Sequence, residues 1–100
     1  MPKHFVGLTD REKLLWVVGF LEGEGCFDRQ TSGTPRIRAT QKQRQPLTRL
    51  RYLVGGAMHQ DSRGHWNWSL NGILAQGLML AIRKHMSPWR AKQIGAALYA

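Results

Sequence analysis

Residues 16–27, WVVGFLEGEGCF, contain the stretch of sequence that decides the fold. An uncharged apolar run, residues 14–21, precedes two alternating Glu-Gly pairs at residues 22–25. Upstream, Thr9 and Glu12 have the spacing of a capping box, in which each side chain bonds the other residue's backbone N–H. The pattern predicts a helix that begins after Thr9 and ends at the glycines of residues 22–25.

Glu22 and Glu24 lie at the carboxyl end of this expected helix. The helix dipole is negative there and disfavours an acid by up to about 1 kcal/mol. The two glutamates are either solvated surface residues or include a ligand for a divalent cation, because carboxylates and helix-end carbonyls are hard oxygen ligands. The spacing of the acids leaves both interpretations open.

Gly19 and Gly23 are four residues apart and therefore share one face of the expected helix. A glycine inside a helix costs about 1 kcal/mol relative to alanine. Close approach of another backbone would compensate that cost. Because the chain is small, a second copy of it is the simplest partner.

The composition indicates a small folded domain with a polyanionic partner. The 100 residues include 15 Lys and Arg, 6 Asp and Glu, and 42% hydrophobic residues, with a formal net charge of +9. One domain over residues 1–100 is expected at this length.

The lone Cys26 excludes an intramolecular disulfide and a CxxC zinc site. No apolar run approaches the ~20 residues that span a bilayer. We therefore expect a soluble intracellular protein, in the cytoplasm or an organelle matrix, with no membrane partner and no small-molecule cofactor.

The rest of the sequence predicts two hairpins and three further helices. Alternating residues predict strands at 26–30, 36–42, 57–60 and 65–70, paired across turns. Apolar spacings of three and four residues predict helices at 47–54, 73–82 and 88–98. The order helix, hairpin, helix, hairpin, helix, helix predicts an α+β fold, with a four-stranded antiparallel sheet and helices on one face.

The sheet face without helices would carry polar and basic side chains. A solvated face is the plain interpretation, but the charge of +9 favours a nucleic-acid surface, since two-stranded ribbons can enter a major groove. The side chains concerned are Asp28, Gln30, Arg36, Arg38, Thr40, His59, Asn67 and Ser69.

Other residues receive plain interpretations. The four tryptophans, at positions 16, 66, 68 and 89, are in phase with apolar faces and are expected in the core. The histidines lack metal-ligand spacing. Arg90 is expected at a solvated or phosphate-facing helix position.

Residues 17–25 and their flanks resemble the motif that names the LAGLIDADG homing endonucleases. The resemblance continues in order through residues 40–42, residues 68–73 and the Lys-containing stretch at 92–94, so it covers nearly the whole chain. It implies the family's saddle-shaped sheet against DNA. It also implies the single-motif type, in which two chains form a homodimer on a near-palindromic site.

The resemblance assigns candidate roles by position. Glu24, with the backbone of Gly23, would bind Mg²⁺ or another divalent cation such as Mn²⁺, and Glu22 would be structural. Gln41 would position water or metal, and Lys92 would stabilise charge or orient the hydrolytic water, so Glu24, Gln41 and Lys92 form the catalytic set. DNA contacts would come from Asp28, Gln30, Arg36, Arg38, Thr40, Lys42, His59, Asn67 and Ser69. The dimer interface would contain Trp16, Gly19, Phe20 and Gly23.

These patterns lead to one leading hypothesis and two alternatives. The leading hypothesis is a Mg²⁺-dependent, homodimeric, site-specific double-stranded DNA endonuclease of the homing type, connected with intron or intein mobility. The first alternative is a non-catalytic DNA- or RNA-binding protein on the same scaffold, such as a transcription regulator or an intron-splicing maturase. The second is a basic structural protein without sequence preference.

Overall fold

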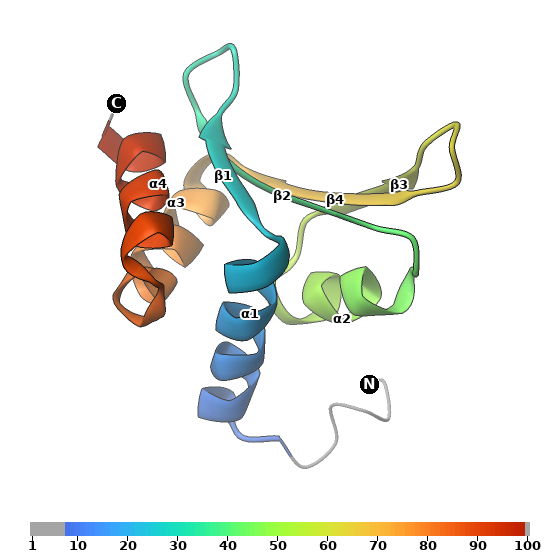
Figure 1. The fold of residues 1–100 in the computed structure, drawn as a ribbon, viewed down its shortest axis with the longest axis horizontal. Coiled ribbons are helices and arrows are strands. Elements are labelled where there is room, and N and C mark those ends of the chain that lie inside the picture. Colours follow the sequence, from blue (N-terminus) through green and yellow to red (C-terminus); the bar gives the residue numbers. More distant parts are fainter. Residues whose placement is uncertain (1–7, 100) are drawn as a thin grey trace.

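The structure of the protein is a computed structural model that describes residues 8–99. Figure 1 shows the order of its elements, which are α1 (Asp10–Glu24), β1 (Cys26–Arg29), β2 (Pro35–Gln41), α2 (Gln45–Val54), β3 (Ala57–Gln60), β4 (Trp66–Asn71), α3 (Gly72–Ile82), a 3-10 turn (Arg83–His85) and α4 (Pro88–Tyr99). The strands form one antiparallel sheet in the order β1-β2-β4-β3. The predicted α+β fold is therefore confirmed.

Five strand ends differ by one residue from the prediction. β2 begins at Pro35 instead of Arg36, and β4 runs from Trp66 to Asn71 instead of over residues 65–70. β1 ends at Arg29 because the backbone N–H of Gln30 donates to Thr34 O (2.8 Å) and closes the turn. β2 ends at Gln41 instead of Lys42. The chain turns after Gln41 and enters α2 at once, and the N–H of Thr48 donates to Arg44 O (3.0 Å) in the first turn of that helix.

Contacts between residues close in the sequence fix both ends of helix α1. Thr9 Oγ1 accepts from the N–H of Glu12 (3.1 Å), and Glu12 Oε1 accepts from the N–H of Thr9 (2.9 Å), so the capping box is confirmed. At the other end, a Cβ added to Gly25 would lie 2.7 Å from Leu21 O. Glycine is needed there because the chain passes directly from α1 into β1, and this places Glu24 at the edge of the sheet.

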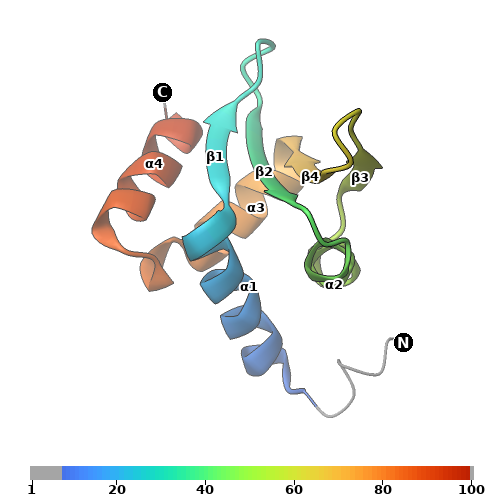
Figure 2. The same cartoon turned by 45° about the vertical axis from the view of Figure 1, so that its right-hand side comes forward.

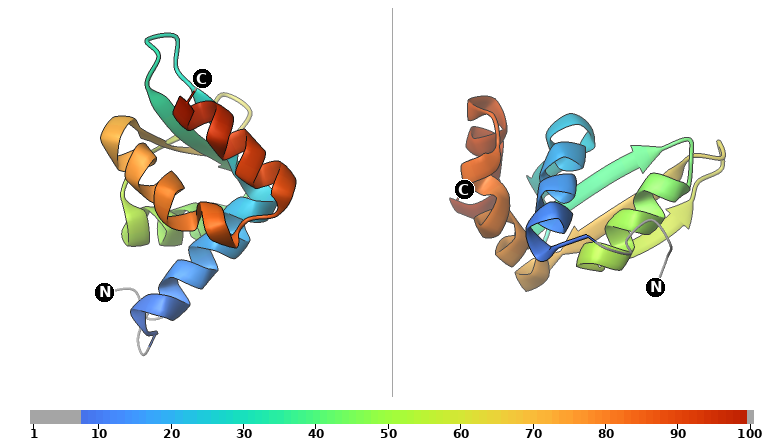
Figure 3. Two further views of the ribbon diagram at one scale, coloured as in Figure 1. Left: turned by 90° about the vertical axis from the view of Figure 1, so that its left-hand side faces the viewer. Right: turned by 90° about the horizontal axis from the view of Figure 1, so that it is seen from below.

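The four helices cover one face of the sheet. Figure 2 shows α3 behind β2 and α2 below the strands, and the right-hand view in Figure 3, from below, shows α1 between α4 and α2. The core between helices and sheet includes Leu21, Ile37, Leu47, Trp68, Met79 and Ile94, each at most 1% exposed. Arg29 links the β1–β2 turn to α4, because its guanidinium donates to Gly33 O and to Ala97 O.

Helix α3 and the start of α4 leave large apolar side chains exposed. On α3, Ala75, Met79 and Ile82 face the core, whereas the apolar Ile73 and Leu74 are 83% and 64% exposed. On α4, the predicted burial of Trp89 is wrong: this side chain is 61% exposed. The neighbouring Arg90, expected near solvent, is buried instead at 6% exposure, because it bonds to the end of α1. None of the helices within residues 8–99 is long and apolar enough to cross a membrane.

Gly56, just before β3, provides a test of the core around Trp68. Its φ is +105°, and an added Cβ would lie 2.5 Å from Trp68 Nε1 and 2.6 Å from Ser69 O. We expect Gly56→Ala to lower the free energy of unfolding by about 2–3 kcal/mol, through backbone strain and displacement of a buried indole. Gly64 is the matched control, because it also has a positive φ (+86°) but its added Cβ meets only Gln60 Nε2, at 3.9 Å. Urea unfolding should show a cost of about 1 kcal/mol for Gly64→Ala; equal costs for both variants would contradict this account.

Candidate nucleic-acid interface

Strand register gathers the predicted polar residues on the face of the sheet that the helices leave uncovered. Arg38 pairs with Ser69, and Thr40 pairs with Asn67, which in turn pairs with His59 on β3. Residues paired across strands point to the same side of a sheet, and these alternate with the core residues. We call this surface the open face; it comprises Cys26, Asp28, Arg36, Arg38, Thr40, Ala57, His59, Asn67, Ser69 and Asn71.

A groove of about 630 Å³ follows the open face. In Figure 1 the sheet curves, and the tips of its two hairpins rise on the side away from α1 and α2. The predicted residues that line the groove are Gln30, Arg36, Arg38, Thr40, His59, Asn67 and Ser69. Cys26 and Asn71 also line it, although neither was predicted there. Alternation along β1 and β4 would have found both, because they follow the parity of Asp28 and Ser69.

Three charged side chains form a cluster on the open face. Asp28 Oδ1 accepts from Arg36 Nε (2.9 Å), while Oδ2 accepts from Arg36 Nη2 (3.0 Å) and from Arg38 Nη2 (2.6 Å). The hydrogen bond from Arg36 is the main reason that the pKa of Asp28 lies below its usual value, and Asp28 in turn raises the pKa of Arg36. The cluster therefore stays ionised at neutral pH, with one net positive charge.

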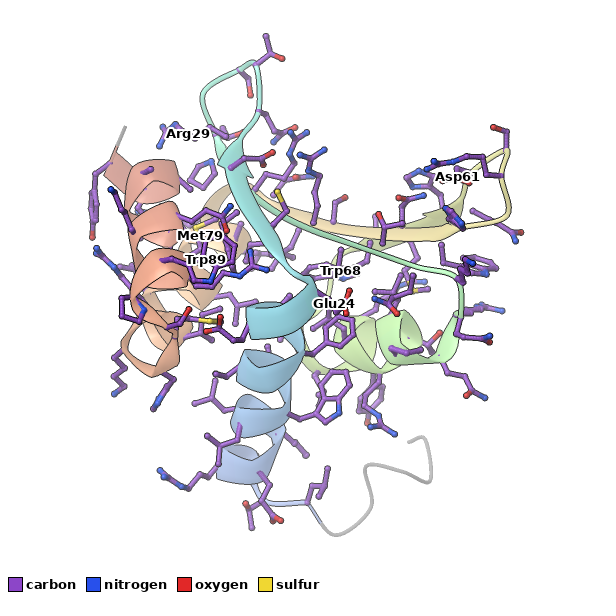
Figure 4. All side chains as sticks on the ribbon, viewed as in Figure 1. Glu24, Arg29, Asp61, Trp68, Met79 and Trp89 are labelled. Carbon is purple, nitrogen blue, oxygen red and sulfur yellow. The ribbon has the colours of Figure 1, made fainter. Side chains whose placement is uncertain are left out.

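A second chain of hydrogen bonds fixes the side-chain amide of Asn67. Thr40 Oγ1 donates to Asn67 Oδ1 (2.7 Å), and Asn67 Nδ2 donates to Asp61 Oδ2 (3.1 Å). Asp61 lies in the β3–β4 turn, which Figure 4 shows at the far end of that hairpin. Both ends of the amide are thus held within the chain, so Asn67 presents a fixed orientation to the groove.

Glu24 and Gln41 meet where α1 ends and β2 ends. Gln41 Nε2 donates to Glu24 Oε2 (2.8 Å), so the two residues that the resemblance paired in function are in direct contact. Figure 4 places Glu24 at the end of α1, and its exposed side chain lines the same groove as the arginines. Gly23, the other candidate metal ligand, is exposed one residue before it.

The donors at this junction fit a hard divalent cation that keeps water ligands. Glu24 supplies a carboxylate, and the end of α1 and the amide of Gln41 supply carbonyl oxygens. Within residues 8–99 no three His, Cys, Asp or Glu side chains come together to hold a metal. A closed protein cage is therefore absent from the described chain, but Mg²⁺ is usually bound by one or two carboxylates together with water and substrate phosphates.

Asp28 and Gln41 do not line the groove but contact residues that do, whereas Lys42 and Lys92 lie away from it. Lys42 is exposed just beyond the end of β2. Lys92 is exposed on α4, and no hydrogen bond or ion pair joins it to Glu24 in the part of the chain that the structure describes. Their predicted contacts with DNA and with the reacting groups remain predictions.

Glu22 joins the end of α1 to the start of α4. Its carboxylate accepts from the N–H of Ser87 (2.6 Å) and from Ser87 Oγ (2.8 Å), and the first of these bonds is the main cause of the lowered pKa of Glu22. Arg90 Nε donates to the backbone O of Glu22 (2.9 Å). The sequence indicated a structural Glu22 but missed Arg90, because nothing in the local pattern marks an arginine for burial.

The four residues predicted at a dimer interface divide into two pairs. Trp16 and Phe20 stack on each other, with ring centroids 5.3 Å apart, and pack at the margin of the core. Gly19 and Gly23 are exposed, and a Cβ added to either would meet nothing within 4 Å. Leu15, one turn before Gly19, is 43% exposed and extends this unpacked stripe, although it was not predicted there.

No protein-family model and no curated protein matches this chain. Solved structures do match. The homing endonuclease I-CvuI, in complex with the I-CreI DNA target, aligns with 89% of this chain at a TM-score of 0.73 and 19% identity. The homing endonuclease I-TnaI aligns with 82% at a TM-score of 0.66 and 24% identity. The archaeal intron-encoded homing endonuclease I-Vdi141I, complexed with DNA, aligns with 79% at 0.65 and 19% identity.

This chain has the LAGLIDADG homing-endonuclease fold. It spans 65% of the I-CvuI chain, 66% of I-TnaI and 60% of I-Vdi141I, which is less than two thirds of each. At these identities the likeness concerns the fold.

Asp61 provides a test of the β3–β4 hairpin that holds Asn67. The hydrogen bond from Asn67, together with backbone N–H donors from His65 and Arg63, lowers the pKa of Asp61 from 3.8 to about 2. A carboxyl whose pKa is lowered by folding stabilises the native state above its unfolded pKa and loses that effect as the pH falls through the folded pKa. We therefore expect the melting temperature to fall less between about pH 4 and pH 2 in Asp61→Asn than in the unmodified chain. Asp10→Asn, at an exposed acid in the first turn of α1, is the control and should keep most of the acid sensitivity; identical pH profiles for all three proteins would contradict the assignment.

Proposed function

We propose that this chain is a divalent-metal-dependent, site-specific double-stranded DNA endonuclease of the homing type, acting as a homodimer in the setting of a mobile intron or intein. One observation carries the proposal: Glu24 at the open end of α1 contacts Gln41 at the end of a basic sheet groove. The similar folds of I-CvuI and I-Vdi141I, both solved with DNA, support it. The net charge of +9 supports a polyanionic substrate.

The open face has the size and chemistry to lie in a major groove. β2 contains seven residues, which span ~23 Å at ~3.3 Å each. That length corresponds to about seven base-pair steps at ~3.4 Å. Base and phosphate contacts would come from the predicted set on and beside this face, which is Asp28, Gln30, Arg36, Arg38, Thr40, Lys42, His59, Asn67 and Ser69.

The junction of α1 and β2 would hold the metal. Mg²⁺, or a similar ion such as Mn²⁺, activates water and stabilises a leaving alkoxide in phosphodiester hydrolysis. Glu24 would bind it with the carbonyl of Gly23. The side-chain N–H of Gln41 donates to one carboxylate oxygen of Glu24 and so fixes the orientation of the carboxylate. The other oxygen would be the one that binds the ion. Lys92 on α4 would supply a cation toward the phosphate that reacts.

The unpacked stripe of α1, formed by Leu15, Gly19 and Gly23, supports the homodimer. Residues 14–21 are apolar all round the helix, a property of helices that are covered on more than one side. The side of α1 that is buried in the chain carries Val17, Val18 and Leu21. A second copy packed along Leu15, Gly19 and Gly23 would cover the opposite side and would bring the Glu24 residues of two chains near each other, one for each DNA strand.

Replacement of Glu24 tests the catalytic proposal. We expect Glu24→Gln to reduce Mg²⁺-dependent cleavage at least ~10³-fold while duplex affinity changes less than ~3-fold, because the amide keeps the shape but loses the charge that binds the ion. Cleavage of a site selected from a random duplex library, alongside a mobility-shift assay in Ca²⁺, measures the two quantities separately.

Glu12→Gln is the control for this experiment, since Glu12 lies at the far end of α1 in the capping box. It should cleave like the unmodified chain. Undiminished cutting by Glu24→Gln would overturn the catalytic assignment. Sequence-selective binding without cutting by the unmodified chain would instead favour the non-catalytic regulator or maturase.

Replacement of Gly19 tests the homodimer. The unmodified chain should sediment at twice 11.4 kDa at micromolar concentration. Gly19→Gln should be monomeric, and the folded monomer itself should lose no stability to urea. Nothing in the chain lies within 4 Å of the new Cβ, and glutamine is a better helix former than glycine. Gly77→Gln in α3, where the Cβ also meets nothing within 4 Å, is the matched control and should stay dimeric. A dimer that survives Gly19→Gln would place the interface elsewhere.

A further inference from the structure

Asp28 is an acid on the face that is proposed to meet a polyanion. It lies on β1 directly opposite Arg36 of β2, and its side chain is 28% exposed. A carboxylate there repels DNA phosphates. Its presence beside the two arginines of the open face, on the edge strand β1, therefore calls for a role other than simple attraction.

The contacts of Asp28 occupy both arginines of β2. One oxygen accepts from Arg36 Nε, and the other accepts from Arg36 Nη2 and Arg38 Nη2, at 2.6–3.0 Å. Arg36 is thus held by a two-point contact, the planar geometry that guanidinium and carboxylate groups match best. Arg38 makes one bond to Asp28 and a longer contact from Nη2 to Cys26 Sγ (3.9 Å), and it is the more exposed of the two, at 48% against 27%.

The restrained arginines keep donors that can still read bases. A guanidinium carries five N–H donors. Arg36 uses two of them on Asp28, and Arg38 uses those of Nη2 on Asp28 and Cys26. Donors on the outer edge of each guanidinium remain, and a two-point contact from such an edge to O6 and N7 of guanine is the commonest specific contact in a major groove.

The same restraint limits contacts that carry no sequence information. Phosphate oxygens lie at the margins of the groove, so an arginine that follows them has to leave the position that suits a base edge. Leaving it breaks hydrogen bonds to Asp28 and exposes an unpaired carboxylate to the phosphates. Binding to a duplex without a matching base therefore carries the free-energy cost of breaking these hydrogen bonds. Binding to a duplex with a matching base does not, because the arginines stay in place.

We propose that Asp28 is a specificity-determining residue, which restrains Arg36 and Arg38 for base contacts and weakens their binding to arbitrary phosphates. The proposal rests on the proposed DNA binding of the open face. It predicts that this acid lowers affinity for random DNA and raises discrimination between sequences.

The test compares neutral variants at Asp28 with the unmodified chain on a random-sequence duplex of about 30 base pairs, across a salt series. Asp28→Asn should bind the random duplex more tightly at low salt. Its affinity should then fall between 50 and 200 mM salt by a further ~3- to ~12-fold, which corresponds to one or two added phosphate contacts at a slope of about 0.9 each. Site selection from a random library should give a weaker base preference for this variant.

Three further variants separate the proposal from simpler effects. Asp10→Asn makes the same change in net charge on α1, away from the open face, and should leave the salt slope unchanged. Asp28→Glu keeps the charge and should keep the unmodified slope. Asp28→Thr is a second neutral variant, with a residue that strands favour, in case the asparagine perturbs the fold.

The outcomes distinguish failure of this proposal from failure of the DNA-binding proposal. If the unmodified chain shows no salt-dependent duplex binding, the proposed function is wrong. If it binds, and the neutral Asp28 variants match Asp10→Asn or bind random DNA more weakly, then Asp28 only braces the sheet and the specificity role is overturned.

Discussion

The direct passage from α1 into β1 is the constraint on which the rest of this structure depends. Gly25 approaches Leu21 so closely that no side chain fits, and Leu21 itself is fully buried. The end of the helix is therefore held against the sheet. Because Glu24 immediately precedes this turn, its carboxylate reaches the end of β2 and contacts Gln41. A longer connection would separate the acid from the groove that it lines.

A second junction reinforces the first. The carboxylate of Glu22 accepts the N–H and hydroxyl of Ser87, and Arg90 bonds to the backbone O of Glu22. α4 thus begins against the end of α1, and Arg90 is buried between them with its guanidinium 4.3 Å from the centroid of Trp89. Two glutamates separated by one residue therefore differ completely in surroundings. One ties helices together, and the other remains exposed at the groove.

The few acids of the chain explain more of its organisation than the many bases do. Glu12 closes the capping box, Glu22 joins two helices, Asp61 organises a turn and Asp28 holds the arginines of β2. Each of these carboxylates accepts hydrogen bonds from defined donors, and the pKa of each is lowered by them. On the open face, the contacts with Asp28 hold the guanidinium groups of Arg36 and Arg38 in defined positions.

The sequence by itself determined the order of elements, the antiparallel sheet and most of the side chains on the open face. Those features depend on local signals, namely capping residues, glycines and alternation, which act over a few residues. It also brought Glu24 and Gln41 to notice as a pair, through a resemblance. Only the tertiary structure decided that Arg90 is buried, that Trp89 and Ile73 are exposed and that Asp28 restrains two arginines. These outcomes depend on how α4 meets α1 and on strand register, and both are contacts between residues far apart in the chain, which no local pattern encodes.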